Sequence, residues 1–166
     1  MTFHVTTHAM GSQAIAETSD TQKHPLGTIV TAHDATLGVG EFIYLKGVGS
    51  TVVGSIVRYD DGFQTALNTS ALTDSLPLAV AMSANVAGDY GWYQIAGLAV
   101  AKKASATTFA DGAGLGSASG LAIAVSTNVQ IQGAVVRTVT TSTGAAANYV
   151  AIAINRPHDI ATAVAA

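Results

Sequence analysis

Residues 55–67 read Ser-Ile-Val-Arg-Tyr-Asp-Asp-Gly-Phe-Gln-Thr-Ala-Leu, and this stretch decides the expected fold. An apolar, β-branched run, Ser55–Tyr59, ends at Asp60-Asp61-Gly62, and a second run, Phe63–Leu67, follows at once. Asp-Gly before a further run is a strong hairpin signal. We therefore expect two antiparallel strands here.

The same alternation of short strands and turns continues on both sides of this hairpin. Further β-rich runs stand between clusters of Gly, Asp and Asn; they are Leu26–Thr31, Glu41–Lys46, Thr51–Val53, Leu76–Met82, Trp92–Ala96, Leu98–Lys102, Leu121–Val125, Val129–Gln132, Val135–Thr141 and Tyr149–Ile154. We expect Gly97 to separate two strands, Asp111–Gly120 to form a loop, and Asn155-Arg156-Pro157 to end the last strand.

Helical periodicity is weak throughout the chain. No amphipathic run reaches the roughly 10–15 residues that the helix of a parallel crossover needs. Many short strands at close spacing predict an all-β fold, with a single β-barrel or β-sandwich domain.

The first 24 residues differ from the rest of the chain. They are polar, rich in Thr, Ser, Gln and His, and end at Pro25. We expect an extended N-terminal arm over residues 1–24, ordered only if something holds it, and a β-rich domain over residues 25–166. Because the arm offers few core candidates, its deletion is expected to leave the β-fold intact. The N-terminus lacks the basic start and apolar stretch of a signal peptide.

Charge and cysteine content exclude several kinds of function. The chain has no cysteine, so a disulfide framework, a thiolate metal site and a cysteine nucleophile are all absent. The formal net charge is -3, with scattered basic residues, so we expect no binding to nucleic acid. Polar residues interrupt the apolar stretches, so we expect no membrane-spanning segment.

The charges are few and unevenly distributed. Only 10% of the residues are charged, against about 25% in an average soluble domain. Between Gly112 and Asn155 the only charged residue is Arg137. Such a stretch is either a surface covered by partners or a neutral Ser/Thr/Asn/Gln surface, and we favour the covered surface.

Histidine and serine offer no recognisable active site. His4 and His8 are four residues apart, but the H-E-x-x-H pattern is absent and no helix is expected there. Ser50 and Ser117 follow glycines in turns, and the G-x-S-x-G pattern does not occur. We therefore expect neither a zinc site nor a serine nucleophile.

The glycine-rich and acidic motifs also have structural explanations. The glycines 112, 114 and 116 lack the spacing and the following helix of a nucleotide loop. Asp60 and Asp61 suit a turn better than a calcium site, and we interpret the Asn68-Thr69-Ser70 sequon as a chance match. The sequence nominates no catalytic, cofactor-binding or metal-binding residue, and we expect a protein that is not an enzyme.

Trp92 lies in a short run of alternating side chains. Period two places Trp92, Gln94 and Ala96 on one face and Tyr93 and Ile95 on the other. Trp92 is either a core residue or an interface anchor, and the burial habits of aromatic residues favour the core.

Three segments of this strand-rich region resemble a known family. They are Gly40-Glu41-Phe42-Ile43-Tyr44-Leu45-Lys46-Gly47-Val48, Pro77-Leu78-Ala79-Val80-Ala81-Met82-Ser83-Ala84-Asn85 and Gly91-Trp92-Tyr93-Gln94-Ile95-Ala96-Gly97. In content and order they resemble the small head-decoration, or cement, proteins of tailed bacteriophages, over roughly residues 40–155.

The resemblance implies a role in virion structure. Such proteins are typically β-rich, often trimeric, and bind the outer surface of the capsid. The implied partners are the major capsid protein and further copies of the chain, and the implied location is the virion, after assembly in the host cytoplasm. The resemblance brings no catalytic residue with it.

Two other classes of function remain open at this level. A carbohydrate-binding or adhesive β-module would need exposed aromatic residues on a shallow face near Trp92. A small β-barrel hydrolase would need a convergent cluster of titratable residues in a deep pocket.

Overall fold

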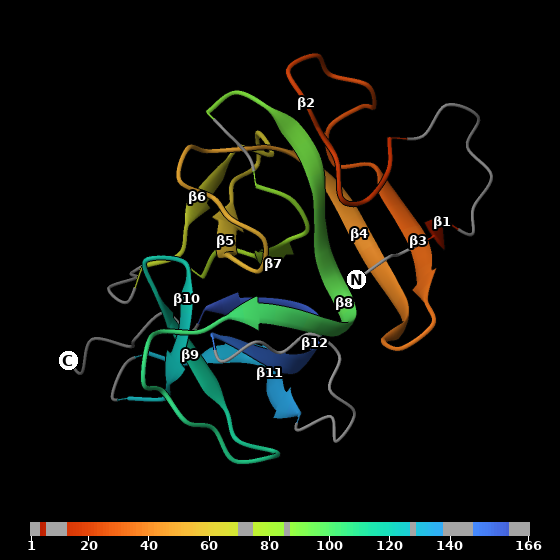
Figure 1. The fold of residues 1–166 in the computed structure, drawn as a ribbon. Coiled ribbons are helices and arrows are strands. Elements are labelled where there is room, and N and C mark those ends of the chain that lie inside the picture. The colour runs from red at the N-terminus through yellow and green to blue at the C-terminus, as the bar shows by residue number, and fades with distance from the viewer. Residues whose placement is uncertain are drawn as a thin grey trace.

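The computed structural model describes residues 4–5, 13–69, 75–84, 87–126, 129–137 and 148–159. Over these residues the chain is all-β (Figure 1), as predicted. The strands are β1 (His4–Val5), β2 (Thr18–Ser19), β3 (Ile29–Asp34), β4 (Gly38–Lys46), β5 (Ile56–Tyr59), β6 (Thr65–Leu67), β7 (Leu78–Ala81), β8 (Tyr90–Lys102), β9 (Leu115–Ala118), β10 (Leu121–Ala124), β11 (Ile131–Arg137) and β12 (Tyr149–Asp159).

One large antiparallel sheet holds ten of these strands. Its main path is β1-β3-β4-β8-β7-β5-β6, while β12 pairs with β8 and β11, and β2 pairs with the start of β8. The hairpin β9–β10 forms a separate two-stranded sheet. The predicted hairpin at residues 55–67 is confirmed, because Val57 pairs with Leu67 and Tyr59 with Thr65.

Strand β8 is the central element of the fold. Its first half pairs with β4 from Lys46↔Tyr90 to Glu41↔Ala96, and its second half pairs with β12 from Asn155↔Ala96 to Tyr149↔Lys102. Between the halves the strand changes direction, so that β12 and β11 lie in a different plane from β3 and β4 (Figure 1). The bent sheet folds over on itself and gives a sandwich-like or barrel-like domain.

The bend occurs at Gly97, and side chains support it locally. Gly97 has φ +100, and a Cβ there would lie 2.5 Å from the carbonyl O of Val39. The side chain of Gln94 is fully buried, and its Nε2 donates to the carbonyl O atoms of Ala96 and Leu98, each at 3.1 Å. The Gln94 side chain thus provides a hydrogen-bond donor to two backbone carbonyl groups that flank Gly97. The expectation that Gly97 separates two strands is wrong, because the pairing continues through it.

Three apolar clusters fill the interior. One packs between β5, β7, the second half of β8, and β9 to β12, and includes Ile56, Leu78, Val136 and Ile152. The other two cover opposite faces of β4 and the first half of β8. Phe42, Tyr44 and Trp92 lie on one face, and Ile43, Leu45, Tyr93 and Ile95 on the other.

Four further expectations about strands need correction. Thr51–Val53 is irregular, and Leu115–Ala118, expected in a loop, forms β9. The run expected as a strand at Val129–Gln132 overlaps only the beginning of a longer strand, β11, which begins at Ile131. Strand β12 passes through Asn155-Arg156-Pro157 to Asp159, and these three residues form a bulge opposite the single residue Gly133 of β11. Within a bulge Pro157 needs no ladder partner for its missing N–H.

A change at Gly97 tests the dependence of the fold on this bend. Gly97→Ala adds both left-handed strain and a clash with Val39, so we expect it to cost about 3 kcal/mol or more in the free energy of unfolding. Gly38→Ala is the matched control, since Gly38 has φ +75 and a Cβ added there would meet no atom within 4 Å; it should cost about 1–2 kcal/mol. Urea unfolding measures both, and equal costs would show that close packing at the bend is unimportant.

Candidate functional site

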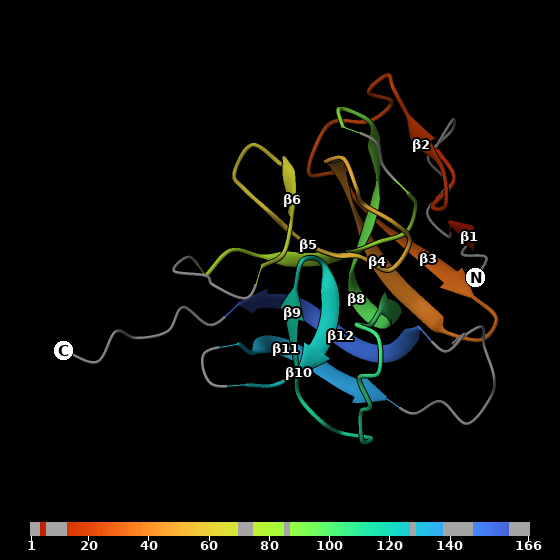
Figure 2. The same cartoon turned by 60° about the vertical axis from the view of Figure 1, so that its left-hand side comes forward.

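The surface formed by residues 104–137 carries very little charge. Asp111 and Arg137 are the only charged residues in this range. Its exposed uncharged residues are Ser105, Ala106, Thr108, Ala110, Gly112, Ser119, Ala124, Val125, Ser126, Gln130, Gln132 and Gly133. We call this set the neutral surface. These residues come from the loop between β8 and β9, the β9–β10 turn, the end of β10 and the segment around the start of β11, and the strands β9 to β11 lie at the end of the molecule away from β2 (Figures 1 and 2).

The neutral surface shares one property with protein contacts, which is its low charge. Charged residues are depleted at the centres of protein–protein interfaces, whereas a free surface usually mixes both signs of charge. Val125 is 45% exposed and is one of four large apolar side chains with substantial exposure among the described residues. Small side chains elsewhere on the surface allow a partner backbone to approach closely.

A second feature is the attachment of the N-terminal segment by Gln13. The indole Nε1 of Trp92 donates to the carbonyl O of Gln13 at 3.0 Å, and the Tyr44 hydroxyl donates to the Gln13 side-chain Oε1 at 2.8 Å. The backbone N of Gln13 donates to Nε2 of His24 at 3.1 Å. The polar atoms of two buried aromatic side chains thus find their partners in this segment.

The rings around Gln13 pack closely together. The ring centroids of Tyr44 and Trp92 are 4.9 Å apart, and those of His24 and Tyr44 are 5.1 Å apart. Burial raises the pKa of Tyr44; a hydrogen bond from the backbone of Lys23 lowers it, and nearby Tyr90 raises it. The net upward shift keeps the Tyr44 hydroxyl protonated, as its bond to Gln13 requires.

The arm expected over residues 1–24 therefore contains core residues. Ile15 is 2% exposed and packs with Trp92 and Phe42, and Gln13 is 6% exposed. Thr18 and Ser19 pair with β8 as β2, and His4 and Val5 pair with β3 as β1. The expectation that the segment can be deleted without loss of stability needs correction, because it closes one face of the aromatic cluster.

The core interpretation of Trp92 is confirmed. Trp92, Tyr93 and Tyr44 are each fully buried. The predicted alternation also holds, since Trp92 and Tyr93 belong to clusters on opposite faces of the sheet. The exposed aromatic face that a carbohydrate-binding module would need is therefore not formed by these residues.

Among the described residues, the histidine and serine candidates from the sequence analysis do not gather in one site. His4 lies opposite His33 in β1, and His8 lies outside the described residues. Ser50 sits in an exposed turn with φ 67, and Ser117 is 1% exposed. No group of three metal-ligating side chains forms within the ranges that the structure describes.

The acidic, glycine-rich and sequon motifs from the sequence analysis have structural roles. One carboxylate oxygen of Asp60 accepts hydrogen bonds from the backbone N atoms of Gly62 and Gln64, at 2.9 and 3.0 Å. Gly112 has φ +75 in a turn before β9. The Nδ2 of Asn68, the atom that a glycan would occupy, is buried and donates to Asp159.

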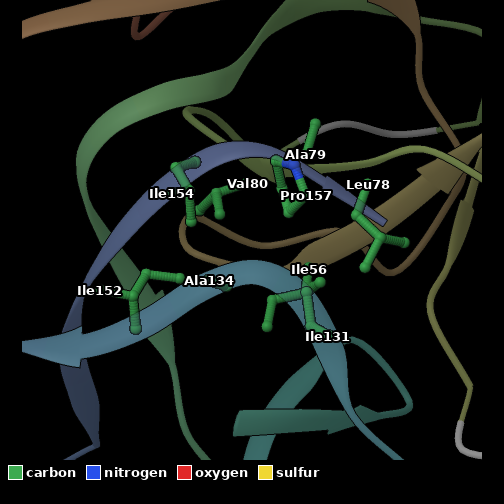
Figure 3. A pocket seen from close by; sticks show the side chains of 9 residues that line it. All are labelled: Ile56, Leu78, Ala79, Val80, Ile131, Ala134, Ile152, Ile154 and Pro157. Atoms are coloured by element: carbon green, nitrogen blue, oxygen red, sulfur yellow. The ribbon is translucent and has the colours of Figure 1, made fainter. Parts of the chain in front are cut away.

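Two cavities among the described residues differ in their linings: one has apolar walls, and the other is an open groove whose lining includes Arg58, Tyr59 and Asp60. An apolar cavity of about 10 Å³ lies between β5, β7, β11 and β12, where side chains such as Ile56, Val80 and Ile152 face one another (Figure 3). That volume is about what one water molecule needs, and its walls offer water no polar partner. An open groove of about 210 Å³ beside the β5–β6 hairpin is lined by Arg58, Tyr59 and Gln64, among others. The Gln64 side chain is already committed to the carbonyl O atoms of Lys46 and Gly47.

Comparison with known proteins adds no relative. No family model, no curated protein and no solved structure matches the chain. No helix of the described residues is both long and apolar enough to cross a membrane.

Truncation of Ile15 measures how much the N-terminal segment contributes to the fold. Ile15→Ala should cost about 2–4 kcal/mol in the free energy of unfolding, because it leaves a cavity beside Trp92. Ile29→Ala is the matched control, since Ile29 is 45% exposed; its expected cost is below about 1 kcal/mol. Tryptophan fluorescence during urea unfolding measures the free energy of unfolding of both variants. Equally small losses in the two would show that the N-terminal segment is dispensable for stability.

Proposed function

We propose that this protein is a virion structural protein, a decoration or cement protein that binds the outer surface of a phage head and stabilises it. Its partners in this proposal are the major capsid protein and further copies of the chain, most simply as a trimer. The observation that carries the proposal is the neutral surface, whose exposed residues are small or uncharged.

Two further properties support the same role. The segments that resemble decoration proteins, residues 40–48, 77–85 and 91–97, supply strands β4, β7 and β8 at the centre of the domain. Cementing a shell also requires several contacts at once, and an oligomer that binds at several points gains avidity without strong individual contacts.

The chemistry of the neutral surface favours dry packing between protein subunits. Side chains such as Ala106, Ala110 and Ala124 lose little conformational entropy on burial. Val125 provides apolar area at the end of β10. Because the surface has few charges, its burial carries little of the desolvation penalty that charged groups incur.

The proposed oligomer is tested by placing a charge on the neutral surface. Val125→Glu should weaken self-association by about tenfold or more, because the contact must then desolvate a carboxylate. Val39→Glu is the matched control: Val39 is 59% exposed on β4, outside the neutral surface. Sedimentation at micromolar concentration and neutral pH measures the mass. A monomeric parent protein, or equal effects of the two changes, would contradict this use of the surface.

Binding to a shell is tested by co-expression with the major capsid protein encoded in the same genome. We expect cryo-electron microscopy to show the chain as extra density at symmetry-related positions on the outside of the shells. Shells made with it should also withstand heating to a higher temperature than shells made without it. Identical shells from the two preparations would refute the decoration role, whatever the oligomeric state of the free chain.

A further inference from the structure

Asn68 and Asp159 meet inside the domain at the end of β12. The Asn68 Nδ2 donates to Oδ1 of Asp159 at 3.2 Å, and the residues are 0% and 7% exposed. The backbone fixes Asn68 from two sides. Its N donates to the carbonyl O of Ile56 at 3.0 Å, and its own carbonyl O accepts from the N of Gly120 at 2.8 Å. Asn68 is therefore a rigid partner held by β5 and the β9–β10 turn.

Each of these side chains has one oxygen without a partner. Asn68 Oδ1 and Asp159 Oδ2 are both buried, and neither makes a hydrogen bond with any described residue. A buried polar atom left unpaired costs about 1–3 kcal/mol, so two adjacent cases require an explanation. An ionised carboxylate cannot provide it, because carboxylate and amide oxygens are both acceptors. A proton on Asp159 Oδ2 turns that atom into a donor toward Asn68 Oδ1.

We propose that Asp159 and Asn68 form a cyclic carboxylic acid–carboxamide pair that holds the end of β12 closed while Asp159 is protonated and loosens when the proton leaves. In the closed pair the Asn68 amide N–H donates to one carboxyl oxygen, and the Asp159 O–H donates to the amide oxygen. Both buried oxygens are then satisfied without a net charge in the interior.

The surroundings of Asp159 agree with this protonation. Burial is the largest influence and raises the pKa of Asp159 to about 6, while the Asn68 hydrogen bond and the positive charges of Arg58 and His158 lower it. Arg58 lies on β5 and His158 on β12. These are the charged groups whose field reaches Asp159 among the described residues, and both favour the ionised form.

The pair sits where β12 contacts two neighbouring strands. Asp159 is opposite Ile131 of β11, and its backbone N donates to the carbonyl O of Leu76 at 3.5 Å. His158 is opposite Gln132 on one side and bridges to Pro77 on the other. When this end opens, the Asp159 carboxylate moves into water, and β12 separates from both β7 and β11.

The direction of the pH dependence follows from linkage. An acid whose folded pKa is raised stabilises the closed form fully below its ordinary pKa, and that contribution is lost as pH rises toward the folded pKa. For a single proton, the equilibrium constant for opening rises by up to about tenfold per pH unit between roughly pH 4 and pH 6, and is flat above that range. The end of β12 is therefore held more firmly in mildly acidic than in neutral solution.

The native protein provides the first test. Carboxyl-carbon NMR should show Asp159 titrating near pH 6, well above an ordinary aspartate. The hydrogen-exchange protection factors of the amides of His158 and Asp159 should fall by up to about tenfold per pH unit between pH 4 and pH 6. The amides of Val30 and Phe42, on β3 and β4, serve as internal controls and should not follow this profile. Titration of Asp159 near pH 4 would overturn the proposal.

Asp159→Asn provides the second test. The new amide offers both a donor and an acceptor to Asn68 at every pH, so protection at His158 should become independent of pH. An unchanged pH profile in this variant would overturn the proposal, because another group would then control the opening. Should the variant fail to fold, the titration of Asp159 in the native protein still decides the question. Both tests use the free chain, so their failure leaves the decoration role unaffected.

Discussion

The whole arrangement depends on one strand, β8, continuing through a bend at Gly97. The first half of β8 completes the β3–β4 sheet, and the second half begins a new plane with β12 and β11. Ala96 pairs with Glu41 on one edge and with Asn155 on the other, so both parts of the domain meet at one residue. A strand that broke here would divide the ten-stranded sheet into two separate sheets. The bend turns them into one domain with connected cores.

Several local irregularities follow from this bend. Gln94 is a buried polar residue whose Nε2 donates to the carbonyl O atoms of Ala96 and Leu98, on either side of Gly97. At the bulge opposite Gly133, where Arg156 has a positive φ of 47°, β12 leaves β8 and continues along β11 to Asp159. Arg156 then reaches Glu41 with an ion pair of 2.6 Å across the corner. This pair is exposed and contributes little stability, so the corner rests on backbone geometry and packing.

A structural feature could be predicted from the sequence where the residues that encode it are close together along the chain. The β5–β6 hairpin is encoded within Asp60-Asp61-Gly62, and the alternation around Trp92 is encoded in successive residues. Strand β9 was missed because its small side chains resemble a loop; Gly116 is required there since a Cβ would lie 2.7 Å from Val129 Cγ1. The burial of Ile15 could not be predicted, because a single large apolar residue in a polar segment forms no periodic pattern. The pairing of Asn68 with Asp159 joins positions 91 residues apart, and no sequence pattern brings them together.

The segments that determine the fold and those that offer a contact surface are largely different. Strands β4, β7 and β8 are largely buried, so their sequences are constrained by core packing. The neutral surface comes from residues 104–137, where Gly, Ala and Ser replace the large residues of the central sheet. Because Val125 lies on that surface and Gly97 lies at the bend, surface and fold can be altered independently. A change on the surface that abolishes assembly without affecting stability would therefore assign function to the exposed side chains of a segment whose buried side chains, such as Leu115 and Val136, belong to the core.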